Sequence, residues 1–226
     1  MIYERDSHFE DRATWWALHV NLVNNEAHAA SWHWFFNYFN VQRFEKPVCV
    51  EGISRHLQMN HSRMPSGRTL DRDISCLLAT YALVIPRPNR DPEDLRECPF
   101  VDLGLMTHFR ESGYYHINHA RKEIPAHLLG YALAKSLQFD RAPAKEKSDI
   151  RIIDAVQGIG GPGRSFLLGG EELLTLLQDS DAARGTLKLE IAGLAGERAV
   201  RMPKVASLDW LGDYYEVQMQ ENIHVG

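Results

Sequence analysis

Two carboxylates and two guanidinium groups stand close together near the middle of the chain. Asp71 and Asp73 lie beside Arg68 and Arg72. Carboxylates hold divalent ions such as Mg²⁺ or Mn²⁺, which activate water for attack on a phosphate ester. Guanidinium groups bind phosphate oxygens through paired hydrogen bonds. These residue types make Asp71 and Asp73 the best candidates in the chain for the catalytic and metal-binding residues of a site that cleaves a phosphate ester.

The same aspartates also fit a structural role. Residues two apart on a helix point to different faces, so Asp71 and Asp73 would not share one ion there. Thr69 or Asp71 could cap a helix that runs to about Leu83, since both residue types are favoured at helix starts. Asp73 could then pair with a neighbouring arginine. The sequence leaves both roles open.

Basic residues surround these aspartates, although the chain as a whole is acidic. Its net charge of −5 argues against a protein that coats nucleic acid through bulk positive charge. Any contact with DNA must therefore be local. Residues 60–68 are predicted to form an exposed loop between helices. The candidate phosphate-binding residues in and around this loop are Arg55, Arg63, Arg68 and Arg72.

A second polar cluster lies near the N-terminus. It contains His8 and the carboxylates Asp6, Glu10 and Asp11, and His19 follows in the next predicted helix. These groups could assemble a metal site. Alternatively, Asp11 caps the helix and His19 is a hydrogen-bonded core residue, because a lone histidine without a defined ligand spacing is seldom a metal ligand.

No motif for an organic cofactor is recognisable. The stretch 158–164 is rich in glycine but lacks the Gly-Lys-Ser/Thr of a phosphate-binding loop, so neither a nucleotide nor another organic cofactor is expected. It reads as a turn in which Arg164 anchors a carboxylate. His116 and His119, with His108 nearby, lack a carboxylate or cysteine at a zinc-site spacing.

Aromatic residues dominate residues 11–39. Four of the five tryptophans of the chain, Trp15, Trp16, Trp32 and Trp34, lie there among leucines and phenylalanines. Their spacing predicts a pair of helices with a ring-filled core. Stacking of the indole rings on unpaired bases is the alternative.

Further elements follow from hydrophobic periodicity and turn residues. Prolines and charges between residues 86 and 99 predict a boundary that divides the chain into a helical domain (1–90) and a second domain (91–226). We expect helices at residues 48–59, 125–137, 148–156 and 171–177, and a hairpin with strands at residues 186–192 and 198–202.

Three helices followed by a hairpin is the order of a winged helix. The sequence thus predicts a mainly α protein, with a helical N-terminal half and a winged-helix-like α+β C-terminal half. The third of these helices is acidic and suits the major groove poorly. The candidate DNA contacts of the module are therefore its wing residues Lys188, Arg198, Arg201 and Lys204. Packing or homodimer formation is the alternative role of the module.

Composition and hydropathy restrict the class of protein. The chain has 226 residues, of which 44% are hydrophobic and 24% charged, enough for a substantial core. Neither a signal peptide nor a membrane-spanning segment is recognisable, so a cytoplasmic protein without membrane contact is expected. Cys49, Cys76 and Cys98 are odd in number and widely spaced, and are expected to be reduced core thiols.

Several segments also carry a family resemblance. The chain resembles the SspB family in an ordered series of motifs that covers nearly its whole length. The motifs are Asp11 with Ala13-Thr14-Trp15-Trp16-Ala17-Leu18-His19, Trp34-Phe35-Phe36-Asn37, residues 70–81, Cys98-Pro99-Phe100-Val101-Asp102-Leu103-Gly104-Leu105, Tyr131-Ala132-Leu133, residues 161–168 and Tyr214-Tyr215. The further N-terminal segment usual in the family, with a His-Glu-Thr-Phe type motif and a helix-turn-helix-like region, is expected to be lacking here.

This resemblance implies a role in bacterial DNA phosphorothioation and defence against phages. The activity it implies is metal-dependent nicking of DNA that prepares a strand for sulfur incorporation, with DNA and other phosphorothioation proteins as partners. The alternative is a non-catalytic subunit of the same system that binds DNA or recruits partner proteins. A third reading is a module that only forms oligomers.

Overall fold

The computed structural model describes residues 5–60, 65–86, 98–119, 122–141, 146–180, 185–194 and 196–225. The chain forms two compact units, which we call the continuous unit (residues 21–122) and the composite unit (residues 1–20 with 123–226). These units do not divide at residues 90 and 91, because a parallel strand pair joins residues 82–85 to residues 106–109 across that point.

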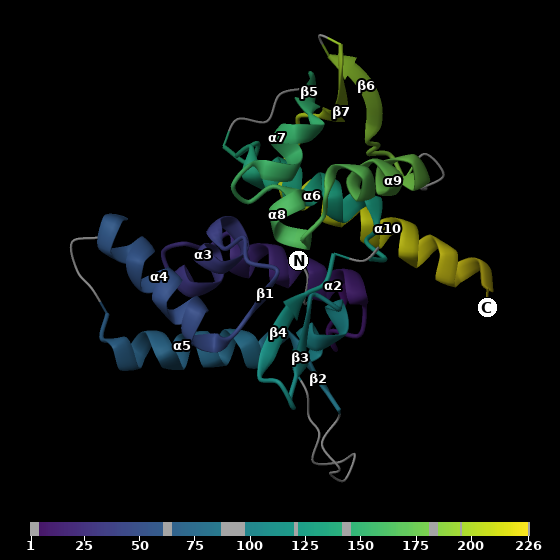
Figure 1. Ribbon diagram of the computed structural model, residues 1–226. Coiled ribbons are helices and arrows are strands. Elements are labelled where there is room, and N and C mark those ends of the chain that lie inside the picture. The colour runs from purple at the N-terminus through teal and green to yellow at the C-terminus, as the bar shows by residue number, and fades with distance from the viewer. Residues whose placement is uncertain are drawn as a thin grey trace. The chain divides into compact units, whose positions relative to one another are not determined.

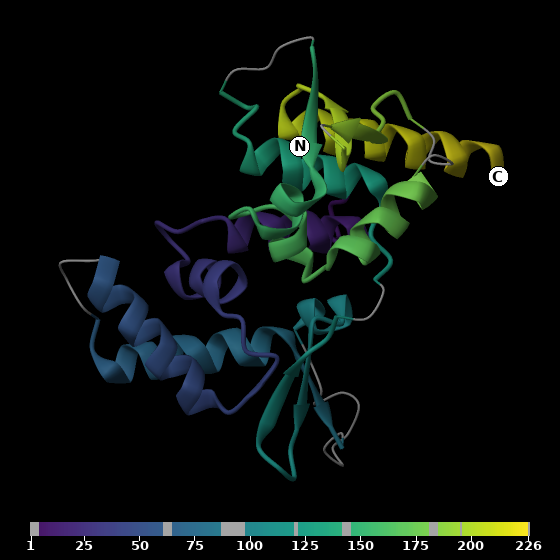
Figure 2. The same cartoon turned by 45° about the horizontal axis from the view of Figure 1, so that its top comes forward.

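Helices form most of the continuous unit. The predicted aromatic pair is confirmed as α2 (Arg12–Val23), which begins in the composite unit, and α3 (Ala30–Tyr38). Helices α4 (Lys46–Asn60) and α5 (Gly67–Tyr81) run side by side (Figures 1 and 2). The buried face of α5 is the periodic one expected from the sequence, and consists of Leu70, Ile74, Leu77, Leu78 and Tyr81.

Aromatic rings fill the core of this unit. Phe44 is 2% exposed and its ring centroid lies 4.8 Å from that of Phe39 and 5.7 Å from that of Tyr115. Phe36 meets Tyr81 edge to face at 5.2 Å. Edge-to-face and offset ring pairs of this kind add stability beyond the area they bury. The ring-filled core predicted for this part of the sequence is thus confirmed.

A four-stranded sheet, absent from the sequence-based prediction, completes the continuous unit. Its order is β1-β4-β3-β2, and only β2 and β3 are parallel among these pairs. The strands are β1 (Arg43–Phe44), β2 (Ala82–Ile85), β3 (Met106–Phe109) and β4 (Tyr114–Ile117), with the 3₁₀ helix η2 (Pro99–Leu103) before β3. Strands of two to four residues are too short to show an alternating pattern. With two sheets in the chain, the fold class is α+β rather than mainly α.

The composite unit combines helices with a three-stranded antiparallel sheet in the order β5-β7-β6. Its elements are α6 (Ala126–Ser136), β5 (Lys147–Arg151), α7 (Ile152–Gln157), α8 (Pro162–Phe166), α9 (Gly170–Ser180), β6 (Glu190–Leu194), β7 (Glu197–Pro203) and α10 (Ser207–Val225). The helices predicted at residues 125–137 and 171–177 and the hairpin are confirmed.

The helix predicted at residues 148–156 is wrong in its first half. Residues 147–151 form β5, and α7 begins only at Ile152. The reason is tertiary, because Ile150 pairs with Val200 of β7, a strand about fifty residues later in the chain. Strand β6 begins at Glu190 rather than at residue 186. The long helix α10 was not expected.

Two contacts fix α10 in the composite unit. Gly130 of α6 lies under the Trp210 ring, where an added Cβ atom would come within 2.3 Å of the indole. Only glycine permits this close approach of the two helices. The Asp213 carboxylate accepts hydrogen bonds from the backbone and hydroxyl of Thr186, from the Leu187 backbone at 2.9 Å, and contacts His127 Nε2 at 3.2 Å.

Hydrogen bonds also join α10 to the start of the chain. The Tyr214 hydroxyl donates to both oxygens of Asp11, at 3.1 and 3.0 Å. The Tyr215 hydroxyl lies 2.6 Å from the Thr14 hydroxyl, which itself donates to Asp6. The first and last parts of the sequence therefore belong to one packed body. Among the described residues, no helix has the length and apolar character needed to span a membrane.

Candidate functional site

The candidate arginines Arg55, Arg63, Arg68 and Arg72 lie in residues 55–72, which we call the arginine-rich segment. This segment runs from α4 into α5. Ser66 caps α5, because its hydroxyl accepts a hydrogen bond from the Thr69 backbone at 3.1 Å. The cap predicted at Thr69 or Asp71 is therefore wrong, because the helix begins earlier, at Gly67. Residues 61–64, which precede Pro65 and Ser66, are not among the described residues. Capping by a serine hydroxyl satisfies one of the free N–H groups of the first turn.

Asp71 is held by a lysine from the neighbouring helix. Its carboxylate lies 2.7 Å from Nζ of Lys46, at the start of α4. The same ammonium group donates to the Ser75 hydroxyl at 3.2 Å, and this hydroxyl donates to the Asp71 carbonyl oxygen at 2.8 Å. An ion pair that is partly exposed contributes little stability. The lysine charge nevertheless compensates the negative charge of the carboxylate, and a metal ion would need that negative charge.

Asp73 lies two residues further along α5 and is half-buried. Within the described ranges, no group of three or more histidine, cysteine, aspartate or glutamate residues is placed to hold a metal ion. Asp71 and Asp73 are the residues that would hold Mg²⁺ or Mn²⁺ under the sequence-based hypothesis, and this role stays a prediction. Lys46 was missed because it lies far from both aspartates in sequence.

The four arginines of this segment differ in their surroundings. Arg68 and Arg72 are exposed and lie one turn apart on α5, and no ion pair involves either of them among the described residues. Arg55 on α4 forms a pair with Glu51 at 2.7 Å. Arg63 lies outside the described residues. Arg68 and Arg72 are thus the pair best placed to bind phosphate.

A groove of about 450 Å³ lies next to these groups. It is lined by residues of α4, including Glu51, Ser54 and Arg55, and by Asp71 of α5. Two carboxylates therefore stand beside one guanidinium group in this groove. The balance of charge is less favourable to DNA here than at the exposed surface of α5.

The predicted wing carries both available and engaged cations. Lys188 and Arg198 are exposed and have no ion pair within the described part of the chain. Arg201 is engaged by Asp149 of β5 through two hydrogen bonds of 2.7 and 2.8 Å. The hydrogen bond from Arg201 lowers the pKa of the Asp149 carboxyl. Lys204 lies 4.0 Å from Glu146. Of the four cations predicted for the wing, Lys188 and Arg198 are thus the two that no carboxylate pairs with in the described part of the chain.

Helix α9 has the acidic character expected from its sequence. Glu171 and Glu172 lie in its first turn, and Glu171 and Asp179 are exposed. Carboxylates at the start of a helix stabilise it through the helix dipole, but they repel phosphate. This arrangement agrees with the expectation that α9 is poorly suited to the major groove.

His19 is a core residue rather than a metal ligand in this structure. It is fully buried, and its Nε2 atom lies 2.6 Å from the carbonyl oxygen of Ser165. Burial lowers its pKa to about 4, which keeps the ring neutral at physiological pH. Asp11 caps α2, because its carboxylate accepts from the Ala13 backbone at 2.8 Å. Both structural roles expected for these residues are confirmed.

The tryptophans, Arg164 and the cysteines, which the sequence analysis also considered, differ in burial and in their contacts. Trp16 and Trp34 are buried, whereas Trp15 and Trp32 are half-buried, so the first two serve the core. Arg164 donates to the carbonyl oxygen of Gln157, at 3.5 Å. Of the three cysteines, Cys49 is buried as expected, but Cys76 is exposed on α5 and Cys98 is half-buried. All three are free thiols.

Comparisons with known proteins give a family and a fold. The family described as "Protein of unknown function (DUF4007)" matches residues 1–215. No curated protein matches the chain. Two solved structures do, one of SspB and one of magnesium ion-bound SspB, with TM-scores of 0.76 and 0.77. Each is 22% identical and covers 94% of this chain. This chain spans 62% of the length of those SspB chains.

Proposed function

We propose that this chain, which belongs to the DUF4007 family, is a DNA-binding and DNA-nicking component of a bacterial DNA phosphorothioation system. The observation that carries the proposal is the likeness of its fold to SspB over 94% of the chain. The proposal also draws on the SspB-like motifs of the sequence. Nicking requires stabilisation of charge on the phosphate that is attacked, and a divalent ion supplies this when bound. One of the similar structures is of magnesium ion-bound SspB.

Within this proposal, two surfaces contact DNA. One is the exposed arginine pair, Arg68 and Arg72 on α5. The other is a winged helix in the composite unit, in which Lys188 and Arg198 lie near the wing. The support for a winged helix is the element order, with one strand, helices and then a hairpin, and the position of β7 between β5 and β6. Charged side chains that touch phosphates position a protein on DNA without reading its sequence.

The experiment that tests the proposal measures conversion of supercoiled plasmid to open circle with Mg²⁺, with Mn²⁺ and with EDTA. We expect metal-dependent nicking, which Asp71→Asn and Asp73→Asn each slow roughly 100-fold, since metal-bound charge stabilisation is worth several kcal/mol. Glu45→Gln, an exposed acid in the same unit, is the matched control. Nicking that persists in both aspartate variants places the active site elsewhere.

A second candidate function is a non-catalytic subunit that binds DNA or recruits other phosphorothioation proteins. The ion pair between Lys46 and Asp71 favours it, because this pair occupies a carboxylate that catalysis would need. This candidate predicts DNA binding at low salt without any metal-dependent nicking. The variant Lys46→Ala separates the two functions further. If Asp71 binds a metal ion, removal of the lysine tightens metal binding; a scaffold shows no such change.

A further inference from the structure

The face of the β1-β4-β3-β2 sheet opposite the aromatic core carries a pocket that neither the sequence motifs nor the comparisons assign. Side chains alternate between the two faces of a strand. Phe44, Tyr115 and Met106 therefore point to the core side, and the residues next to them along each strand point to the other side. That second face holds Arg43, His116, Tyr114, Thr107, Phe109, Leu83 and Ile85.

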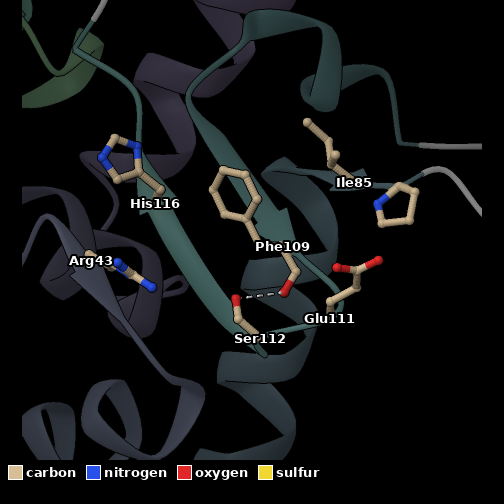
Figure 3. A pocket seen from close by; sticks show the side chains of 7 residues that line it. Arg43, Ile85, Phe109, Glu111, Ser112 and His116 are labelled. Atoms are coloured by element: carbon tan, nitrogen blue, oxygen red, sulfur yellow. Dashed lines mark hydrogen bonds between the residues drawn. The ribbon is translucent and has the colours of Figure 1, made fainter.

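Apolar surface is exposed on this second face. Phe109 and Ile85 pair in register on β3 and β2, and each is 43% exposed. They line a pocket of about 670 Å³ together with Pro86 and the turn between β3 and β4. Figure 3 shows the Phe109 ring between His116 on one side and Ile85 on the other. A volume of this size is typical of sites for small organic groups.

The turn that closes one end of this pocket is firmly held. The Arg110 backbone donates to the Ile85 carbonyl oxygen at 2.9 Å, and the Gly113 backbone donates to that of Phe109 at 2.9 Å. Gly113 has φ of +73°, a left-handed conformation that favours glycine. The Ser112 hydroxyl also contacts the Phe109 carbonyl oxygen, at 3.4 Å. Phe109 is thus presented on a fixed backbone, which lowers the entropy cost of binding.

Positive charge stands beside the exposed ring. The guanidinium of Arg43 lies over the Tyr114 ring, 4.4 Å from its centroid. This cation–π contact orients the side chain and leaves its N–H donors available. Among the described residues no carboxylate pairs with Arg43, and the lining contains one acid, Glu111, one guanidinium, Arg43, and the hydrogen-bonding ring of His116. The pocket therefore suits a flat ring that carries an anionic group next to it.

We propose that this sheet face binds unpaired bases of a DNA strand, with one base stacked on Phe109 and adjoining phosphate held by Arg43 and His116. Proteins that bind single strands commonly combine aromatic stacking surfaces on a sheet with cationic side chains for the phosphates. The choice of DNA over RNA rests on the proposed function, whereas the stacking and phosphate contacts rest on the geometry of the pocket alone.

The test is fluorescence anisotropy of a labelled single-stranded deoxyoligonucleotide of about 15 nucleotides, a length that spans known single-strand sites. The full chain is compared with Phe109→Ala at low salt. We expect the Kd to rise about tenfold, the effect of losing one base-stacking contact. Because Phe109 is 43% exposed and lies on the sheet face away from the aromatic core, its truncation leaves the packing of that core intact. Tyr38→Ala removes a similarly exposed ring of the same unit and should leave the Kd unchanged.

Further variants separate stacking from general apolar contact. Phe109→Trp should retain binding, and Phe109→Leu should behave like Phe109→Ala, because leucine is apolar but has no ring face. Arg43→Gln should weaken binding and reduce the slope of log K against log salt by about 0.7, the value for one phosphate contact to a single strand. Equal affinity for Phe109→Leu and the unchanged chain would contradict stacking.

Failure of this inference can be told apart from failure of the proposed function. A chain that nicks plasmid but binds the single strand equally with and without Phe109 overturns the inference alone. A chain that needs Phe109 for the single strand but does not nick leaves the inference standing and removes the nicking activity. Tighter binding of an RNA oligonucleotide of the same sequence would overturn the choice of DNA.

Discussion

The charged side chains on the outer faces of the two sheets have different kinds of partner. On the β5-β7-β6 sheet the charged side chains pair with one another, as in Asp149 with Arg201 and Lys147 with Glu190. On the β1-β4-β3-β2 sheet Arg43 instead lies over Tyr114, beside an exposed Phe109. A cation that already has a carboxylate partner contributes less to ligand binding than one that does not. Arg43 of the β1-β4-β3-β2 sheet is therefore more available to a ligand than Arg201 and Lys147 of the β5-β7-β6 sheet.

The interiors of the two units differ in how far aromatic rings dominate them. The continuous unit packs ring against ring, with Phe44 between α3 and β4. Both units also bury polar groups and satisfy them with hydrogen bonds, as at His33 in the continuous unit and at His19 and Asp213 in the composite unit. Ring packing is insensitive to pH, whereas buried titratable groups make stability depend on it. Four predictions test this contrast, and the first concerns the rings.

Phe44→Ala should have the largest effect. It removes a buried ring that contacts Phe35, Phe39 and Tyr115, and large-to-small changes of this type cost about 4 kcal/mol. Urea denaturation measures the loss. Phe109→Ala in the same sheet is the control, with an expected cost below about 2 kcal/mol because its ring is 43% exposed. Equal costs for the two variants would mean that the sheet faces are not distinct.

Asp213→Ala should follow, at about 3 kcal/mol. The variant removes a buried carboxylate and leaves the part-buried N–H groups of Thr186 and Leu187 without their acceptor. Burial alone would raise the pKa of Asp213, but the hydrogen bonds outweigh it and the pKa is lowered. The stability that this lowered pKa contributes is thus present above about pH 4 and is lost as the pH falls through the folded pKa. Urea denaturation of Asp213→Ala and of Glu216→Ala, an exposed control on the same helix, checks the prediction.

His19→Gln should change the pH dependence of stability. Burial lowers the folded pKa of His19 to about 4, below its ordinary value of 6.5. Its contribution is therefore complete above pH 6.5 and is lost as the pH falls from 6.5 to about 4, by up to ~3 kcal/mol. Denaturation curves across this range should be flatter in the variant, which keeps a donor for the Ser165 carbonyl. His28→Gln, at an exposed position, should follow the unchanged chain.

Asp149→Asn should have the smallest effect on stability, because the pair with Arg201 is at the surface. The variant removes the negative charge that holds Arg201, so that this guanidinium becomes available to another ligand. If Arg201 contacts DNA as the sequence predicts, its release should tighten binding of duplex DNA and increase the salt slope by about one phosphate contact. An unchanged slope would remove Arg201 from the set of DNA-binding residues. Anisotropy titrations at several salt concentrations provide the measurement.

Elements formed by residues close together in sequence were predicted better than elements that depend on residues far apart in sequence. Helices with long periodic patterns were predicted well, as for α5 with Leu70, Ile74 and Leu77 on one face. The four-stranded sheet was missed, since its strands are short and β2 pairs with β3 across the segment 86–105. Residues 148–151 were predicted as helix because their pairing partner, β7, lies about fifty residues away.

The candidate site shows the same limit. Residue types and charge located the arginines, and Arg68 and Arg72 are indeed exposed. The partner of Asp71 could not be read locally, because Lys46 comes from a different helix. The pairing of Arg201 with Asp149 was likewise hidden by a separation of 52 residues. The aromatic pocket escaped notice because no strand of that sheet was expected.

The hydrogen bonds that tie Asp11 and Thr14 to Tyr214 and Tyr215 also bear on how the chain folds during synthesis. The continuous unit leaves the ribosome as a single stretch and can fold as soon as residue 122 has emerged. The composite unit must wait for α10, because Tyr215 follows its partner Thr14 by 201 residues. Asp11 and Thr14 therefore remain without their tyrosine partners until α10 has been made.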